Sequence, residues 1–178
     1  MFALFFAHYK RFTQQSPNSF VKFESFNCKR AAPETKTPAS MDPDETELVR
    51  TSFAKVAPIK AATAAIFYDR LFQVAPELRG TFPTDVTQQG AKLMAAIGFV
   101  VAGLDRLESI IPQVHELGCR HVDYAVRDAH YDIVGDTLIW TLEKVLGAAF
   151  TPETRKAWIE AYGMVAEAMI AAPKMRAA

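Results

Sequence analysis

Apolar residues recur along most of this chain at the three- and four-residue spacing that is typical of amphipathic helices. The first such segment begins at Asp42-Pro43, where an aspartate suited to the N-cap precedes a proline suited to the first helical turn. Pro58 interrupts the apolar pattern of this segment. We therefore predict a first helix that begins after residue 42 and ends before residue 58.

The second helix is predicted over about residues 60–74, because Pro76 follows directly and cannot continue it. Its predicted inward side chains are Phe67, Leu71 and Val74, which lie three or four residues apart. A compact corner that contains Pro76 is expected to follow this helix.

Four further segments show the same helical periodicity, and none alternates in the manner of a β-strand. Gly147 stands at the expected C-cap of one segment, and Thr151-Pro152 begins the last. The pattern thus predicts an all-α fold of six or seven helices joined by short loops. The four segments are about residues 86–107, 107–120, 128–147 and 152 onward.

Composition agrees with one helical domain. The chain has 178 residues, of which 50% are hydrophobic, so a sizeable core is within its reach. No apolar run reaches the ~18 to 20 residues that a membrane helix requires. Its two cysteines, Cys28 and Cys119, form no CxxC metal motif. We expect a cytoplasmic protein without a membrane span.

Residues 1–40 differ from the rest, with six Lys/Arg against two Glu and no sustained period. We predict a poorly ordered N-terminal extension there and one domain over residues 41–178. A signal peptide, an organelle transit peptide and an upstream start-site extension that ends before Met41 are alternatives. The domain itself has 14 basic and 18 acidic residues, a balance that gives no reason to expect nucleic-acid binding.

His121 is the main candidate for chemistry. Val114, Leu117 and His121 lie at helical spacing, so two aliphatic side chains and an imidazole share one face. Most histidines on such a face are hydrogen-bonded core residues. A flat apolar macrocycle with iron at its centre, however, needs one neutral imidazole between helices. Its ring N–H would bond a backbone carbonyl near Leu117.

Four other short motifs accompany His121 along the chain. Tyr68 lies in a Phe-Tyr-Asp-Arg segment, Phe82 in the corner after the second helix, and Gln89 before an apolar helix with Leu93. Tyr131 follows His121 by ten residues. Taken alone, the tyrosine and the leucine have ordinary core roles, and the glutamine an ordinary surface role.

Together these motifs resemble the globin family over about residues 44–172, especially single-domain bacterial haemoglobins and the haem domain of flavohaemoglobins. The resemblance implies a globin fold of six to eight helices around haem b. It implies that His121 is the proximal iron ligand and that Phe82 wedges against the porphyrin. It also places Tyr131 and Val134 in the cofactor site.

On the opposite face, the resemblance matches Tyr68, Gln89 and Leu93 with the distal residues of flavohaemoglobin-type pockets. The O–H of Tyr68 and the N–H of Gln89 are donors suited to the partial negative charge of a dioxygen ligand. These two residues are therefore the candidates for ligand stabilisation or catalysis.

The sequence departs from the family pattern at Pro173. Flavohaemoglobins have there a glutamate that pairs with the tyrosine equivalent to Tyr131, and a proline provides no such acceptor. Glu167 lies six residues upstream, which is not a helical repeat of the same face. We therefore expect no proximal relay of the flavohaemoglobin type and an iron–histidine bond of ordinary strength.

The resemblance implies reversible binding of dioxygen, carbon monoxide and nitric oxide, as in oxygen transport. An alternative is a nitric oxide dioxygenase that depends on a separate reductase, since no glycine-rich dinucleotide loop follows the globin-like region. A further alternative is a haem-based gas or redox sensor. Both a monomer and a homodimer are compatible with this sequence.

Overall fold

The computed structural model describes residues 41–82, 85–124 and 126–177, so the predicted N-terminal extension lies outside the described residues. No strand occurs in these ranges, and the all-α prediction is confirmed. Short 3-10 helices connect the α-helices at η2 (Ala57–Ile59), η3 (Pro76–Thr81), η4 (Leu104–Arg106) and η5 (Gly147–Ala149). The α-helices are α2 (Pro43–Val56), α3 (Lys60–Val74), α4 (Val86–Gly103), α5 (Leu107–Asp123), α6 (Asp128–Leu146) and α7 (Pro152–Ala177).

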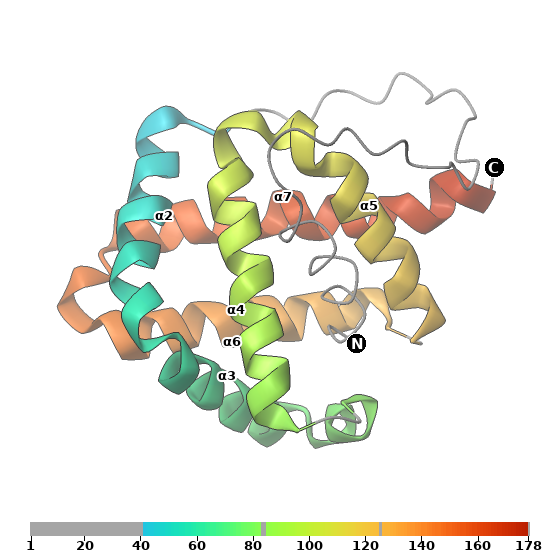
Figure 1. Cartoon of the computed structure of the whole chain (residues 1–178), viewed down its shortest axis with the longest axis horizontal. Coiled ribbons are helices and arrows are strands. Elements are labelled where there is room, and N and C mark those ends of the chain that lie inside the picture. Colours follow the sequence, from blue (N-terminus) through green and yellow to red (C-terminus); the bar gives the residue numbers. More distant parts are fainter. Residues whose placement is uncertain (1–40, 83–84, 125, 178) are drawn as a thin grey trace, which may run out of the picture.

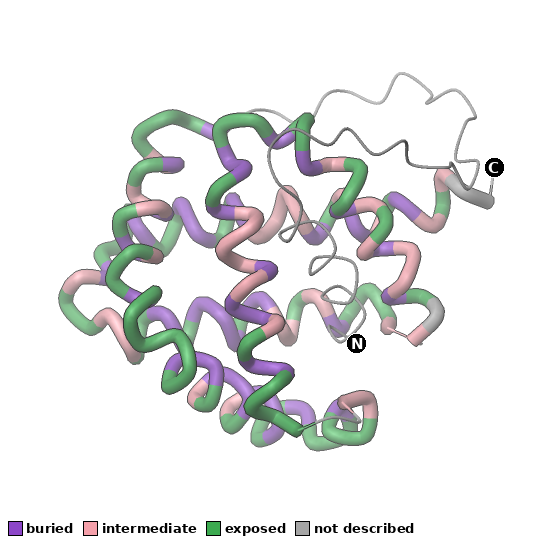
Figure 2. Tube along the Cα trace, viewed as in Figure 1, coloured by how far each residue is buried: buried purple, intermediate pink, exposed green. Residues whose placement is uncertain are grey.

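The helices pack in crossing layers. α6 and α7 lie against one another and run across the back of the view, while α4 passes in front of them (Figure 1). α5 packs along α7, and α3 packs on both α4 and α6. Buried residues follow the inward sides of these helices (Figure 2). Among the described helices, none combines the length and the apolar character that a membrane crossing requires.

α2 begins where the sequence predicts. The Asp42 carboxylate accepts a hydrogen bond from the backbone N–H of Asp44 at 2.8 Å, and Pro43 occupies the first turn. Glu45 pairs with Lys156 of α7 at 2.7 Å. Because this lysine is largely exposed, the ion pair contributes little to stability but joins the first turn of α2 to α7.

The prediction that Val74 faces inward is wrong. Its side chain is 46% exposed, whereas Tyr68 and Phe72 are buried. The buried residues of α3 are neighbours in the sequence that recur every four residues, such as Phe67 with Tyr68 and Leu71 with Phe72. This buried stripe continues to Ala75 at the end of the helix. Val74 therefore lies on the flank of this stripe, and Leu78 of η3 fills the core below it.

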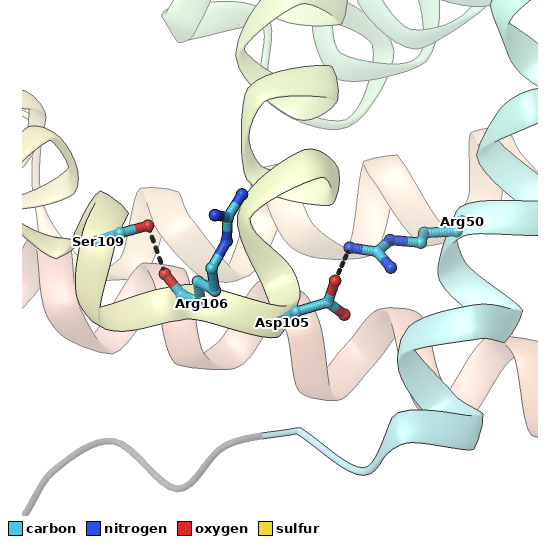
Figure 3. A network of polar contacts seen from close by, with 4 residues as sticks. All are labelled: Arg50, Asp105, Arg106 and Ser109. Carbon is cyan, nitrogen blue, oxygen red and sulfur yellow. Dashed lines mark hydrogen bonds and ion pairs between the residues drawn. The ribbon is translucent and has the colours of Figure 1, made fainter.

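The third helix is shorter than predicted, because α4 ends at Gly103 and η4 turns the chain before α5 begins. At this corner, Arg50 of α2 forms an ion pair with Asp105 (Figure 3). The Ser109 hydroxyl donates to the carbonyl of Arg106 at 2.7 Å. These contacts lie at the corner from which α5 leads to its last turn, which contains His121.

Candidate functional site

An apolar cavity opens among the helices, and all six described α-helices contribute to its lining. Its empty space, counted with the open mouth, is about 1160 Å³. The lining is almost entirely apolar, which is typical of a site that holds an apolar cofactor. Six of the seven residues singled out from the sequence line it, namely Tyr68, Phe82, Leu93, His121, Tyr131 and Val134.

His121 lies in the last turn of α5 and is 5% exposed. Its Nδ1 is 2.8 Å from the carbonyl oxygen of Leu117, the partner that the sequence predicts. Burial lowers the pKa of His121, an effect that the hydrogen bond to Leu117 partly opposes. The ring is therefore neutral at pH 7, and donation from Nδ1 places the ring's lone pair on Nε2.

Tyr131 stacks on this imidazole, with ring centroids 5.9 Å apart and an interplanar angle of 28°. The Tyr162 hydroxyl of α7 donates to the backbone carbonyl of Tyr131 at 2.7 Å, so α6 and α7 are joined beside the histidine. Burial and the nearby charge of Asp128 raise the pKa of Tyr131 to about 12. A neutral, half-buried phenol therefore restricts the orientation of the His121 ring.

Tyr68 reaches the cavity from α3. Its side chain is 1% exposed, and its ring makes edge contacts with Phe67 at 5.2 Å and Phe82 at 5.4 Å between centroids. Its hydroxyl is buried and has no hydrogen-bond partner among the described residues. Burial raises the pKa of Tyr68 well above its ordinary value, so the group is a protonated donor at pH 7. Such buried donors are rare unless a ligand or water completes them.

Gln89 does not line the cavity. It is fully buried in the first turn of α4, four residues before Leu93, which does line it. Since residues four apart share a helical face, Gln89 continues the inward face of α4 beyond the lining. Its predicted surface role as a single residue is wrong, because a buried amide in this position belongs to the core.

His130 lines the cavity, although the sequence interpretation gave it no role in the site. It is 8% exposed in the first turn of α6, and the guanidinium of Arg127 lies 3.1 to 3.3 Å from its Nε2. The signal was present in the sequence, because His130, Val134 and Leu138 follow one another at four-residue spacing. This spacing places the histidine on the inward face of α6.

The donor set fits an iron porphyrin. Among the described residues no group of three or more His, Cys, Asp or Glu could hold a bare metal ion. One buried neutral imidazole and one buried hydroxyl without a partner instead line the same apolar cavity. A metal held here would need most of its ligands from a cofactor, as haem iron does.

Comparison with known proteins decides the family. The model of the family described as Globin matches residues 65–169, more than half of the chain. The chain belongs to the globin family. Globins pack their helices around a haem pocket. This globin likewise has an apolar cavity among its helices, with a buried imidazole in the lining.

Relatives of this globin include proteins named Flavohemoprotein. That of Bacillus subtilis (strain 168) is 40% identical over 112 residues, which are 61% of this chain and 28% of the relative. That of Oceanobacillus iheyensis is 29% identical over 143 residues, 79% of this chain and 35% of the relative. That of Bacillus thuringiensis subsp. konkukian is 37% identical over 107 residues, 58% of this chain and 26% of the relative. The globin thus spans 26% to 35% of the length of these relatives.

Proposed function

We propose that this globin holds haem b in the cavity and binds dioxygen reversibly, for transport or storage. One observation carries the proposal: the buried Tyr68 hydroxyl, with no partner among the described residues, lines the same apolar cavity as the neutral imidazole of His121. Relatives whose names denote haem proteins support the cofactor assignment.

Each lining residue has a role in this proposal. Haem b would supply the iron at which dioxygen, carbon monoxide or nitric oxide binds. His121 would ligate that iron through Nε2, and its bond to the Leu117 carbonyl would orient the ring. The apolar side chains of Phe82, Leu93 and Val134 would contact the macrocycle and exclude water from it.

Tyr68 would donate its hydroxyl proton as a hydrogen bond to the ligand, whose oxygen atoms carry partial negative charge when dioxygen binds. The raised pKa of Tyr68 keeps this proton on the phenol. The amide of Gln89 is a second candidate donor in the proposal. From its position behind the lining, it would act only after a side-chain rearrangement toward the cavity.

Replacing Tyr68 by phenylalanine tests this role. A hydrogen bond to a charged acceptor contributes about 1.5 to 3 kcal/mol, so Tyr68→Phe should speed dioxygen release by roughly tenfold to a hundredfold. Carbon monoxide release should barely change, since that ligand carries much less negative charge on its oxygen. Stopped-flow displacement and flash photolysis would measure both rates.

Tyr124→Phe is the matched control for Tyr68→Phe. It also removes a tyrosine hydroxyl, but Tyr124 lies at the end of α5 and outside the cavity lining. Dioxygen release should therefore stay close to the wild-type rate in this control. Equal acceleration of dioxygen and carbon monoxide release by Tyr68→Phe would indicate a steric role and count against the proposal.

A second candidate function is nitric oxide dioxygenation supported by a separate reductase. The similarity to proteins named Flavohemoprotein and the donor at Tyr68 favour it. In this reaction nitric oxide and dioxygen give nitrate, and the haem iron must then regain one electron from the reductase. The two functions therefore differ in whether nitrate formation continues beyond one turnover.

We expect the haem-loaded protein, mixed with nitric oxide in air, to form a burst of nitrate equal to its haem content. Formation should then become slow with only a nicotinamide cofactor and should resume when a flavin reductase is added. Nitrate and haem content would be measured together, with reductase alone as the control. Fast continuous nitrate formation with the nicotinamide alone would contradict this expectation.

A further inference from the structure

α5 and α7 form the most extensive helix pair among the described elements, and Gly118 of α5 lies at a close backbone contact with Met169 of α7. A Cβ atom added to Gly118 would be 2.7 Å from the Cα of Met169 and closer still to its carbonyl oxygen. These neighbours are backbone atoms, which cannot rotate away as the end of a side chain does. Only glycine fits this position without displacement of one helix against the other.

Pro173 removes the helical hydrogen-bond donor of the same Met169 carbonyl. This proline lies inside α7, four residues after Met169. Because proline has no backbone N–H, it cannot give the Met169 carbonyl the i+4 hydrogen bond that a helix normally provides. The carbonyl that loses this donor is therefore the one that faces Gly118, and glycine Cα–H groups at helix crossings make weak hydrogen bonds to such oxygens.

The turn of α5 that contacts Met169 is also the turn that orients His121. Gly118 directly follows Leu117, whose carbonyl accepts the hydrogen bond from His121 Nδ1 at 2.8 Å. Displacement of this turn from α7 would move the Leu117 carbonyl and the imidazole relative to the cavity. Met169 itself lines that cavity, so the crossing lies at the site.

We propose that Gly118 and Pro173 are a pair of positioning residues: Pro173 frees the Met169 carbonyl to pack on Gly118, and this contact sets where α5 presents His121. The proposal rests on the proposed role of His121 as iron ligand.

A double-mutant cycle on the full chain tests the pair, with Gly118→Ala, Pro173→Ala and the double variant. Gly118→Ala should speed haem loss to an apoglobin acceptor by about tenfold or more, the effect of an overpacked contact. In the Pro173→Ala background the restored N–H draws the Met169 carbonyl back into the helix. Gly118→Ala should then cost less, because its contact with the carbonyl oxygen is relieved while that with the Met169 Cα remains, and coupled contacts of this kind are non-additive.

Resonance Raman spectroscopy of the ferrous, ligand-free protein provides a readout that a general effect on helix stability would not move. Pro173→Ala should retain haem and shift the iron–histidine stretching frequency from the wild-type value. This variant keeps the proposal falsifiable if Gly118→Ala does not fold. Gly163→Ala on α7 is the matched control, since a Cβ there meets nothing within 4 Å, and it should change neither readout.

Additive effects in the cycle together with an unchanged stretching frequency in Pro173→Ala would overturn the pairing. Urea unfolding of the haem-free variants separates this failure from failure of the proposed function. If the unfolding midpoints are non-additive, the contact between the two helices is supported. If the wild type then shows no iron–histidine band, His121 is rejected as the ligand. That result would also overturn the positioning role proposed for the pair.

Discussion

His121→Leu should fail to retain haem while its helices still form. The imidazole is the proposed iron ligand, and leucine has similar bulk but no lone pair to offer. Haem binds only the folded chain, so its loss should lower the free energy of unfolding. The decrease should be about 4 kcal/mol when free haem is a thousandfold above its dissociation constant.

Haem titration followed by Soret absorbance, with circular dichroism of the same samples, would measure both parts of this expectation. His115→Leu is the matched control, because His115 lies on the same helix, outside the cavity lining. The control should bind haem as the wild type does. Normal haem content and ligand spectra in His121→Leu would assign the ligand to another residue.

Trp158→Ala should destabilise the protein by about 3 to 5 kcal/mol, the usual range for removal of a large buried aromatic side chain. Trp158 is 3% exposed, packs against Phe53 and lines the cavity. Its indole N–H donates to the Ser52 hydroxyl at 2.8 Å, which joins α7 to α2. The substitution therefore removes both apolar packing and a hydrogen bond between these helices.

Urea unfolding of the haem-free protein would measure this effect apart from ligand binding. Trp158→Phe retains most of the packing and should cost about 1 kcal/mol, the usual net contribution of one hydrogen bond. Ile159→Ala changes the next residue, which is 52% exposed, and should stay within about 0.5 kcal/mol of the wild type. A loss in Trp158→Ala no larger than in Ile159→Ala would show that α2 and α7 are held together elsewhere.

Helical periodicity and terminal signals were enough to predict the elements. All six described α-helices occur in the predicted segments, and Asp42 and Gly147 cap α2 and α6 as expected. Which side chains of each helix are buried was less predictable. Val74 is exposed because α3 buries a stripe of adjacent pairs, a pattern that depends on which helices pack against it. That information lies in tertiary contacts and not in the periodicity of one segment.

The site was predictable where one helix sets the geometry. The bond between His121 and Leu117 spans a single turn of α5 and follows from helical spacing. The Tyr162 bond to the Tyr131 carbonyl joins two helices and could not be read from either segment alone. Gln89 illustrates the same limit, because whether an inward residue reaches the cavity depends on the helices opposite it.

Tyr162 also limits which substitutions this globin can accept. A Cβ atom added at Gly135 would lie 2.6 Å from the Tyr162 ring, so alanine there requires this ring to move. The moved ring would carry its hydroxyl away from the Tyr131 carbonyl beside His121. Gly135 therefore helps to keep the tether between α6 and α7 in place.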